Sequence, residues 1–470
     1  MSEEQNPAMG ASEQPDPELE AQMILLAASH HDIETLRTLL RTGSANVQDP
    51  DTGYTPLHCA IAALAPEPEH ATPGAAEGEQ SNGQLDADAM AQKEKEREDD
   101  IQAAARTMRL LLQNGAIWND LDNNDETPGC LARRLRLREL YEIMVDAGVR
   151  AELLLNRLDE YEPLGDDDED DDEPEEGEAD NQDDKEKDAT TTSAPEDQVD
   201  TANTTTQPTP IATEDNAATG PTPADPTDAS TLNPAYLSST LSITPHRILD
   251  ASANAVMMSW ETSLMQSTAR LLAPVPGLRI LNIGHGMGII DQAFRDAPTP
   301  ELAAGAPPMP EIPHTPSDHV IVEAHPDVLR HMGEQGWHSR PGVRVLGGRW
   351  QDVVPQLVEN GDVFDAIFFD TFAEDYKALR DFFTEYVVAL LEPDGGRFSF
   401  FNGMGADRAV CYDVYNKVVE MDLFEAGFDV EWSDFPIPSE GLKKSGTWDG
   451  VRRAYWDVQN YRTPLCRFMQ

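Results

Sequence analysis

An apolar strand that runs directly into three alternating glycines most constrains the fold of this chain. The segment Leu278-Arg-Ile-Leu-Asn-Ile-Gly-His-Gly-Met-Gly-Ile-Ile290 places Gly284, Gly286 and Gly288 between a buried strand and the start of a helix. Glycines let the backbone turn sharply and approach a ligand closely, and a helix N-terminus follows. The pattern indicates a loop that binds a nucleotide-like ligand, although it also occurs in NAD and flavin enzymes and in ordinary strand-to-helix turns.

The residue at the end of the next strand helps to distinguish a ligand-binding loop from an ordinary strand-to-helix turn. The run His319-Val-Ile-Val-Glu-Ala324 predicts a buried strand that closes on Glu323, where adenosine-binding α/β folds place the carboxylate that accepts the ribose hydroxyls. Glu323 follows Gly284 by 39 residues, about twice the usual distance. Residues 297–318 are rich in Pro and Ala, however, and without those 22 residues the spacing falls to 17.

Further strands follow at regular intervals and predict a parallel sheet. Val343-Arg-Val-Leu346 and Phe364-Asp-Ala-Ile-Phe-Phe-Asp370 are separated by helix-compatible segments. The segment Leu390-Leu-Glu-Pro-Asp-Gly-Gly-Arg-Phe-Ser-Phe400 then resembles the turn and fifth strand of S-adenosylmethionine (AdoMet)-dependent methyltransferases. Residues 428–437 and 453–468 could form the last antiparallel pair of that fold. The resemblance implies a Rossmann-like α/β domain with a seven-stranded sheet, and a nicotinamide-binding Rossmann domain is the alternative.

An upstream motif makes the resemblance more specific. Val256-Met-Met-Ser-Trp-Glu-Thr-Ser-Leu-Met265 resembles a segment of guanidinoacetate methyltransferase that fungal protein arginine N-methyltransferases also carry. Gly284–Ile289, Gly347-Gly-Arg-Trp-Gln-Asp-Val353 and Phe369-Asp-Thr-Phe372 follow in the same order as in those enzymes. The match covers most of residues 233–470, which we expect to form the methyltransferase domain.

The N-terminal part resembles ankyrin repeats. Leu25–Gly43 is followed by Asp51-Thr-Gly-Tyr-Thr-Pro-Leu-His-Cys-Ala60, and Met108–Gly115, Asp125–Ala132 and Leu140–Gly148 form a second copy. We expect an all-α ankyrin-like module over residues 20–158, with an insertion near 66–100. Helix pairs of this kind must stack to bury their apolar faces, so about three would form a short solenoid.

Repeats of this kind joined to a guanidino-type domain resemble the fungal protein arginine N-methyltransferase 2 family. The resemblance implies methylation of the internal δ nitrogen of an arginine in a protein, with a ribosomal protein as one candidate substrate and the repeats as the expected contact to it. The hairpin with two glutamates and the Thr-His-Trp loop of the common arginine methyltransferases are both missing here. Two alternatives stay open: a methyltransferase of small guanidino compounds, and a catalytically silent interaction protein.

The net charge of −53 is concentrated between the two expected domains. Residues 165–180 are almost entirely acidic, and a Thr/Pro/Ala/Asp-rich run continues to about residue 232. We therefore expect residues 159–232 to be a disordered linker, because so few apolar groups cannot offset the entropy of ordering. An electrostatic attraction for a basic, Arg-rich substrate is a second interpretation of the same charge.

Composition also bears on partners and location. No dense Lys/Arg stripe is present to neutralise a phosphate backbone, no apolar run reaches membrane-spanning length, and the N-terminus shows no secretory signal. We expect an intracellular protein, in cytoplasm and nucleus, that binds neither nucleic acid nor membrane directly. The sequence does not settle its oligomeric state. The four cysteines are not spaced as disulfide or metal pairs, and the histidines follow no zinc pattern, so we expect no metal.

Two carboxylates are the expected catalytic groups. A guanidinium is a poor nucleophile with a high pKa, and carboxylates can orient its planar fork and accept its proton. Asp370 ends the fourth strand and Glu261 lies in the Trp-Glu motif. The alternative roles are a helix N-cap for Asp370 and a surface helix position for Glu261.

The resemblance also implies a set of residues that contact AdoMet. For Met257, Met265 and Trp350, packing in the core is the alternative role. The expected contacts are Tyr236, Met257, Met265, Gly284, His285, Gly286, Met287, Gly288, Ile289, Glu323, Ala324, His325, Trp350, Gln351 and Asp370.

Overall fold

The computed structural model describes residues 17–66, 83–158, 233–296 and 315–470. The acidic tract of residues 165–180 and most of the Pro- and Ala-rich segment that precedes Glu323 lie outside these ranges. Within them, residues up to Leu158 and those from 233 onward belong to one compact unit.

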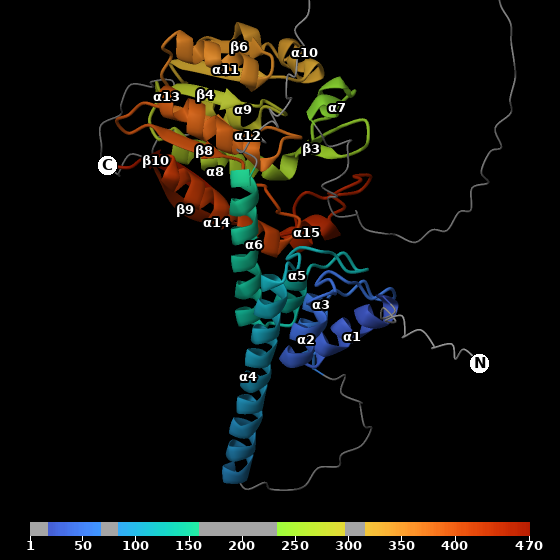
Figure 1. Cartoon of the computed structure of the whole chain (residues 1–470). Helices are drawn as coiled ribbons and strands as arrows, with labels where there is room; N and C mark the ends of the chain where they lie inside the picture. Colours follow the sequence, from blue (N-terminus) through green and yellow to red (C-terminus); the bar gives the residue numbers. More distant parts are fainter. Residues whose placement is uncertain (1–16, 67–82, 159–232, 297–314) are drawn as a thin grey trace, which may run out of the picture. The chain divides into compact units, whose positions relative to one another are not determined.

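The expected sheet is confirmed: it has seven strands in the order β6-β5-β4-β7-β8-β10-β9 (Figure 1). The first five of these strands run parallel, and β10 is antiparallel to both of its neighbours. The strands span Arg279–Ile283 (β4), Asp318–Glu323 (β5), Val343–Gly347 (β6), Ala366–Phe369 (β7), Arg397–Phe400 (β8), Phe428–Pro436 (β9) and Asn460–Phe468 (β10). Because β4 pairs with both β5 and β7, the ends of these three strands meet at one edge of the sheet.

Side-chain alternation along the strands buries both faces of the sheet. In β4, Ile280 packs with the cluster that includes helices α8 and α9, whereas Leu281 packs with the cluster that includes α11 and α14. The helices span Thr262–Leu272 (α8), Ile289–Arg295 (α9), Pro326–Glu334 (α10), Trp350–Glu359 (α11), Tyr376–Asp381 (α12), Val388–Leu390 (α13), Ala409–Glu425 (α14) and Ser439–Lys444 (α15).

A short segment precedes this sheet and carries the motif with Trp260 and Glu261. It consists of helix α7 (Asn233–Ser238) and a small antiparallel sheet of β1 (Ser242–Ile243), β2 (Arg247–Leu249) and β3 (Ala255–Met258). A single 3₁₀ turn, Ser259–Glu261, then leads into α8. The Trp-Glu motif therefore lies at a turn between a strand and a helix.

The N-terminal part consists of helices that pack in pairs. They are α1 (Pro17–Ser29), α2 (Ile33–Leu39), α3 (Pro56–Ala62), α4 (Gly83–Gln113), α5 (Pro128–Arg134) and α6 (Arg138–Leu158). α1 packs on α2, α3 on α4 and α5 on α6, while α3 also contacts α1 and α5. Thr55 and Thr127 cap α3 and α5 in the same way, each followed by a proline in the first turn. The equivalent Thr-Pro sites mark two copies of one local structure.

The last N-terminal helix packs against the C-terminal part of the chain through α14. Gly129 and Gly148 lie so close to this helix that a Cβ atom at either position would be 2.6 Å from Val410 or Val414. Tyr141 donates a hydrogen bond of 2.6 Å to Asp413. One buried cluster therefore runs from the N-terminal helices through α14 to the sheet.

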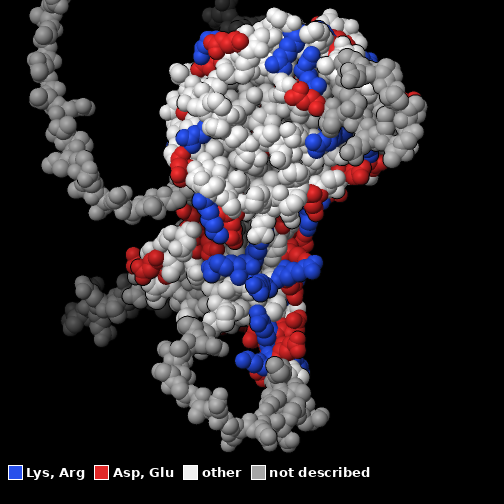
Figure 2. Space-filling model, turned by 180° about the vertical axis from the view of Figure 1, so that it is seen from behind, with Lys and Arg blue, Asp and Glu red and all other residues white. Residues whose placement is uncertain are grey.

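Charge is not distributed evenly over the described surface. Lys and Arg side chains gather near the middle of the view in Figure 2, with Asp and Glu side chains next to them. The strongly negative net charge of the chain therefore does not describe every part of its surface. No described helix combines the length and the apolar character that a membrane crossing requires.

Candidate active site

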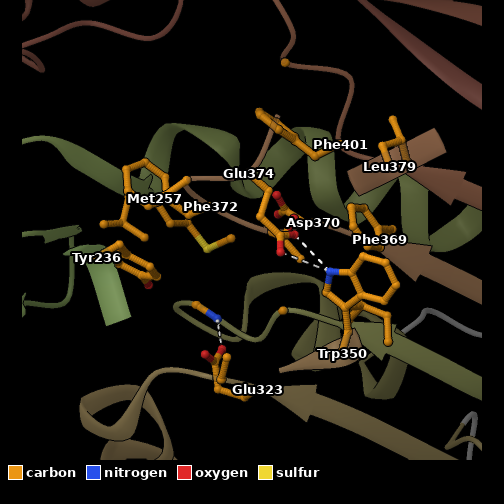
Figure 3. A pocket seen from close by; sticks show the side chains of 18 of the residues that line it. Tyr236, Met257, Glu323, Trp350, Phe369, Asp370, Phe372, Glu374, Leu379 and Phe401 are labelled. Carbon is orange, nitrogen blue, oxygen red and sulfur yellow. Dashed lines mark hydrogen bonds between the residues drawn. The ribbon is translucent and has the colours of Figure 1, made fainter. Parts of the chain in front are cut away.

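A cavity of about 240 Å³ opens where β4, β5 and β7 end. Figure 3 shows Tyr236 and Met257 on one side and Trp350 and Leu379 on the other, with Asp370 between them. Ten of the residues predicted from the sequence line it: Tyr236, Met257, Glu261, Gly284, Gly286, Glu323, Ala324, Trp350, Gln351 and Asp370. This edge is where parallel α/β sheets bind their ligands.

The first loop glycine is required by a close approach of two chain segments. Gly284 has a φ of +91°, and a Cβ atom there would be 1.9 Å from the carbonyl oxygen of Asp370. The amide of Asp370 donates to the carbonyl of Ile283, so the loop lies directly against the end of β7. Gly288, with a φ of +72°, precedes α9. These positions therefore need glycine because the loop packs too closely against its neighbours in the chain to admit a Cβ atom.

Glu323 is held by backbone donors. Its Oε2 accepts from the amides of His285 (2.9 Å) and Gly286 (3.3 Å), and its Oε1 accepts from the amide of His325 (2.7 Å). The carboxylate is nearly buried and lines the cavity. The parallel register of β4 and β5 brings it beside the glycine loop despite the long intervening segment. A charged acceptor oriented in this way suits the ribose hydroxyls of an adenosine ligand.

A buried carboxylate fixes the glycine loop from below. Asp291 accepts from His285 Nδ1 at 2.6 Å, from His319 Nε2 at 2.9 Å and from the Asn282 amide at 2.9 Å. Burial would raise the pKa of Asp291, but the hydrogen bonds from the two histidines outweigh it and lower the pKa to about 2. The His285 ring is therefore a support for the loop, and its contribution at the cavity is its backbone amide.

On the opposite wall, Trp350 combines two of the roles considered for it. Its ring packs edge-on against Phe369, Phe382 and Tyr386, and its Nε1 donates to Glu374 at 2.9 Å. Gln351 also donates to Glu374, at 2.8 Å (Figure 3 shows the Trp350 bond). Trp350 is thus both a core anchor and a wall of the cavity.

Tyr236 and Met257 form the other side. The Tyr236 ring packs against His325 and Phe372 with centroid distances of 4.8 and 4.9 Å. Met257 Sδ accepts from the amide of Met287 at 3.2 Å, which ties the small sheet to the glycine loop. Both side chains are buried next to the open space, as expected for groups that cover a ligand.

Glu261 is not a surface helix residue, since only 2% of it is exposed. The 3₁₀ turn directs its side chain back into the cavity, where Oε1 accepts from the Met258 amide at 2.9 Å and from the Tyr455 hydroxyl. Burial raises the pKa of Glu261 to about 7, although both hydrogen bonds act in the opposite direction. This carboxyl is poised to gain or lose a proton near neutral pH.

Asp370 is not a helix N-cap, because the next helix starts at Tyr376 and is capped by Asp375. Its Oδ2 is buried and accepts no hydrogen bond from the residues that the structure describes. Burial raises the pKa of Asp370 well above the ordinary value, and the negative charges of Glu261, Glu323 and Asp291 raise it further. An orphaned buried oxygen of this kind requires a donor from outside the chain.

The arrangement is complementary to a cation. Among the described residues, neither Lys nor Arg forms an ion pair with Glu261, Glu323 or Asp370. A positively charged ligand that donates hydrogen bonds would satisfy Asp370 and relieve the repulsion between the carboxylates. No group of three His, Cys, Asp or Glu side chains in the described ranges is arranged to hold a metal ion.

Several predicted ligand contacts lie outside the cavity lining. Met265 packs with Leu272 and Ile290 in the core, so the alternative role of core packing holds for it. Of the remaining five, four act through the backbone or beneath the loop: His285, Met287, Gly288 and His325. Ile289 is the first residue of α9.

The structure adds residues that the sequence did not single out. Glu374 and Asp375 come shortly after the Phe-Asp-Thr-Phe motif that ends at Phe372, so their proximity in sequence to Asp370 was a usable signal. No residue pattern marks Phe401, Met404 or Tyr455 themselves. Phe401 directly follows the segment predicted as the fifth strand, and Tyr455 lies within residues 453–468, which were expected in the last antiparallel pair. Tyr455 is separated from its partner Glu261 by 194 residues.

Known proteins similar to this chain are methyltransferases of guanidino groups, in agreement with the geometry of the cavity. The guanidinoacetate N-methyltransferase family model matches residues 243–429. The chain is 50% identical to protein arginine N-methyltransferase 2 of Aspergillus fumigatus, over 96% of this chain and 97% of that protein. It is 48% identical to the enzyme of the same name from Emericella nidulans (97% and 98% covered) and 43% identical to that from Neurospora crassa (96% and 96%).

Proposed function

Because this chain belongs to the protein arginine N-methyltransferase 2 family, we propose that it methylates the internal δ nitrogen of an arginine in a protein substrate. It is an AdoMet-dependent protein arginine N-methyltransferase, and the position of the methyl group is the part we propose. The motifs around Glu261 and Asp370, and the lack in this sequence of the glutamate hairpin of enzymes that modify terminal nitrogens, support the guanidino-type branch. The δ position itself comes from the resemblance to this family.

The observation that carries this proposal is the pair of carboxylates without a cationic partner. Glu261 and Asp370 line one cavity with the glycine loop and Glu323, and the Asp370 Oδ2 has no donor. An arginine guanidinium offers five N–H donors in a planar fork and a full positive charge. It supplies what the cavity lacks.

The residues at the other end fit AdoMet. Glu323 offers acceptors for the ribose, the glycines leave room for close approach, and Trp350 with Gln351 forms the wall that follows β6. When bound, AdoMet supplies a methyl group already activated by its sulfonium. The chain then has to align the arginine nitrogen and stabilise the charge around it.

We assign the chemistry of the chain to Asp370 and Glu261. In this assignment Asp370 orients the guanidinium through its unpartnered oxygen, which keeps positive charge away from the reacting nitrogen. Glu261, with a pKa of about 7, accepts the proton that leaves as the new C–N bond forms. Both groups must be ionised before the cationic substrate binds.

The N-terminal helices are proposed to be an ankyrin-like module that contacts the protein substrate. Support comes from the stacked helix pairs, the matching Thr-Pro caps and the bond between His58 Nε2 and the carbonyl oxygen of Glu126, which joins one copy to the next. A ribosomal protein in the cytoplasm or nucleus remains the candidate substrate. The acidic segment 165–180, proposed as a linker, lies outside the described residues.

The test combines the full chain, labelled AdoMet and a panel of arginine-bearing proteins. Fragmentation mass spectrometry separates a δ-methylated arginine from one methylated on a terminal nitrogen. We expect label on the internal nitrogen and its loss in Glu261→Gln and Asp370→Asn. Label on free guanidino acids alone would favour the small-molecule alternative, and label on terminal nitrogens would refute the proposed position.

A further inference from the structure

We propose that Tyr455 is a positioning residue for methyl transfer: its hydroxyl fixes the Glu261 carboxylate so that one oxygen stays available to the arginine guanidinium. This inference rests on the role proposed above for Glu261. It adds a residue from the C-terminal segment, far in sequence from the motifs of the glycine loop and strand ends.

The two oxygens of Glu261 have different surroundings. Oε1 accepts both hydrogen bonds that the carboxylate receives, one from the Met258 amide and one from the Tyr455 hydroxyl. Oε2 accepts none from the described part of the chain. Two donors on one oxygen fix the rotation of the carboxylate, so the other oxygen is left to meet a ligand in the cavity that both residues line.

Tyr455 is itself rigidly placed. Its ring packs against Trp260 and Trp448, with centroid distances of 5.9 and 5.2 Å. Trp260 immediately precedes Glu261, so the same aromatic cluster supports the turn that carries the carboxylate and the hydroxyl that binds it. This arrangement keeps the acceptor in place before substrate arrives, which is how pre-organised sites lower the barrier.

The hydroxyl also controls the charge of Glu261. Burial raises the pKa of this carboxyl, and the Tyr455 bond is the larger of the two hydrogen bonds that oppose the rise. Removal of the hydroxyl should therefore raise the pKa of Glu261 further and leave less of the ionised form near neutral pH. The Tyr455 hydroxyl keeps its proton, because burial and the nearby Glu261 raise its pKa well above the ordinary value.

The test is Tyr455→Phe in the full chain, which removes the hydroxyl and keeps the ring. A hydrogen bond to a charged group is worth enough to shift the acid limb of the kcat/KM profile upward by about 1 to 2 pH units. We expect kcat/KM for the protein substrate to fall about 10- to 100-fold at about pH 7 and to recover in part at about pH 9. AdoMet affinity should stay the same.

The matched control is Tyr376→Phe. Tyr376 also donates to a carboxylate, Asp422, at 2.6 Å, but it does not line the cavity. This change should leave the pH profile in place. An unmoved acid limb in Tyr455→Phe, or an equal loss at every pH together with weaker AdoMet binding, would overturn the inference.

Two further variants keep the result decisive. If Tyr455→Phe does not fold, 3-fluorotyrosine at position 455 retains the ring and makes the hydroxyl a stronger donor. The acid limb must then move to lower pH, and an unchanged limb refutes the inference. If Glu261→Gln leaves arginine methylation intact, the proposed function of Glu261 fails; if only Tyr455→Phe is without effect, the present inference fails alone.

Discussion

The carboxylates at the two ends of the cavity differ in how many hydrogen bonds they accept. Glu323, at the AdoMet end, receives three backbone amides, and the loop that supplies two of them is fixed beneath by Asp291. Asp370, at the proposed guanidinium end, has a buried oxygen to which no described residue donates, and Oε2 of Glu261 accepts no hydrogen bond from the described residues either. A carboxylate that accepts several hydrogen bonds is held rigidly and can bind a ligand in a fixed orientation. The charge of a buried carboxylate that lacks a donor is destabilised until a cationic ligand binds. The contrast assigns binding to one end and chemistry to the other.

The first way to break this contrast is Glu323→Ala. Two hydrogen bonds from ribose hydroxyls to a charged acceptor are worth about 1.5–3 kcal/mol each, so AdoMet affinity should fall about 10²- to 10⁴-fold, below detection in a calorimeter. The variant also leaves the amides of His285 and His325 without an acceptor. Glu323→Gln keeps one acceptor and should lose less. An unchanged dissociation constant in Glu323→Ala would remove Glu323 from the AdoMet site.

At the other end the matching change is Asp370→Asn, which keeps the shape of the side chain and removes its charge. Turnover should drop by about 10²- to 10⁴-fold, while AdoMet affinity stays within a few-fold. Single-turnover rates at saturating AdoMet measure the effect on the methyl-transfer step. A loss of less than about threefold would rule out Asp370 as a catalytic carboxylate.

The pH dependence of kcat/KM and of stability tests the role of Glu261 without a mutation. Because burial raises the pKa of Glu261 to about 7, the ionisation of Glu261 alone should make kcat/KM rise about tenfold per pH unit up to about pH 7. Burial also raises the pKa of Asp370, which must be ionised as well, so its titration adds to this acid limb. The contribution of Glu261 to the free energy of unfolding changes with pH in the opposite direction to kcat/KM. Glu261 has an ordinary pKa of 4.5, so its protonated form favours folding, and this contribution is lost as pH rises from about 4.5 to about 7.

Thermal melting between about pH 4.5 and about pH 7 tests whether Glu261 loses its stabilising contribution as the pH rises, with Glu261→Gln as the control. The variant carries no proton to lose, so its melting midpoint should vary less with pH between about 4.5 and about 7 than that of the unchanged chain. Identical curves for both proteins would mean that Glu261 does not titrate in this range.

The smallest effect is expected for Trp350→Phe. The change removes the Nε1 bond to Glu374 but leaves an aromatic ring against Phe369 and Phe382. The lost bond joins two groups of the chain, and Gln351 still donates to Glu374, so AdoMet affinity should fall only about two- to tenfold and the single-turnover rate should hardly change. A turnover defect as large as that of Asp370→Asn would show that the two ends are not separate.

Local patterns in the sequence predicted the sheet and most of the AdoMet end. The strand that runs into Gly284, the strand that closes on Glu323 and the segment that ends at Asp370 are all present, within one or two residues of the expected limits. The alternating burial of side chains along a strand and the backbone conformations of glycine depend only on neighbouring residues. They can therefore be predicted from short sequence segments. The cavity lining around Trp350 follows from the same strand ends.

Other features required the folded chain. Met265 and Met257 belong to the same motif and pack in the same buried cluster, yet only Met257 also lines the cavity. Phe401 and Tyr455 reach the cavity from segments that the sequence predicted only as parts of the sheet, without a pattern that marks these two side chains. Spacing alone could not separate these cases, because burial depends on which elements pack against a given face.

The sequence by itself determined the order of the strands along the chain, the glycine loop and the identity of the carboxylates. The tertiary structure decided their state. It placed three backbone donors on Glu323, gave Glu261 a hydroxyl from Tyr455 and left an oxygen of Asp370 without a partner. The physical reason is that residue type fixes which charge a group can carry, whereas its pKa and hydrogen bonds depend on the solvent it loses and the neighbours it gains when distant segments pack together.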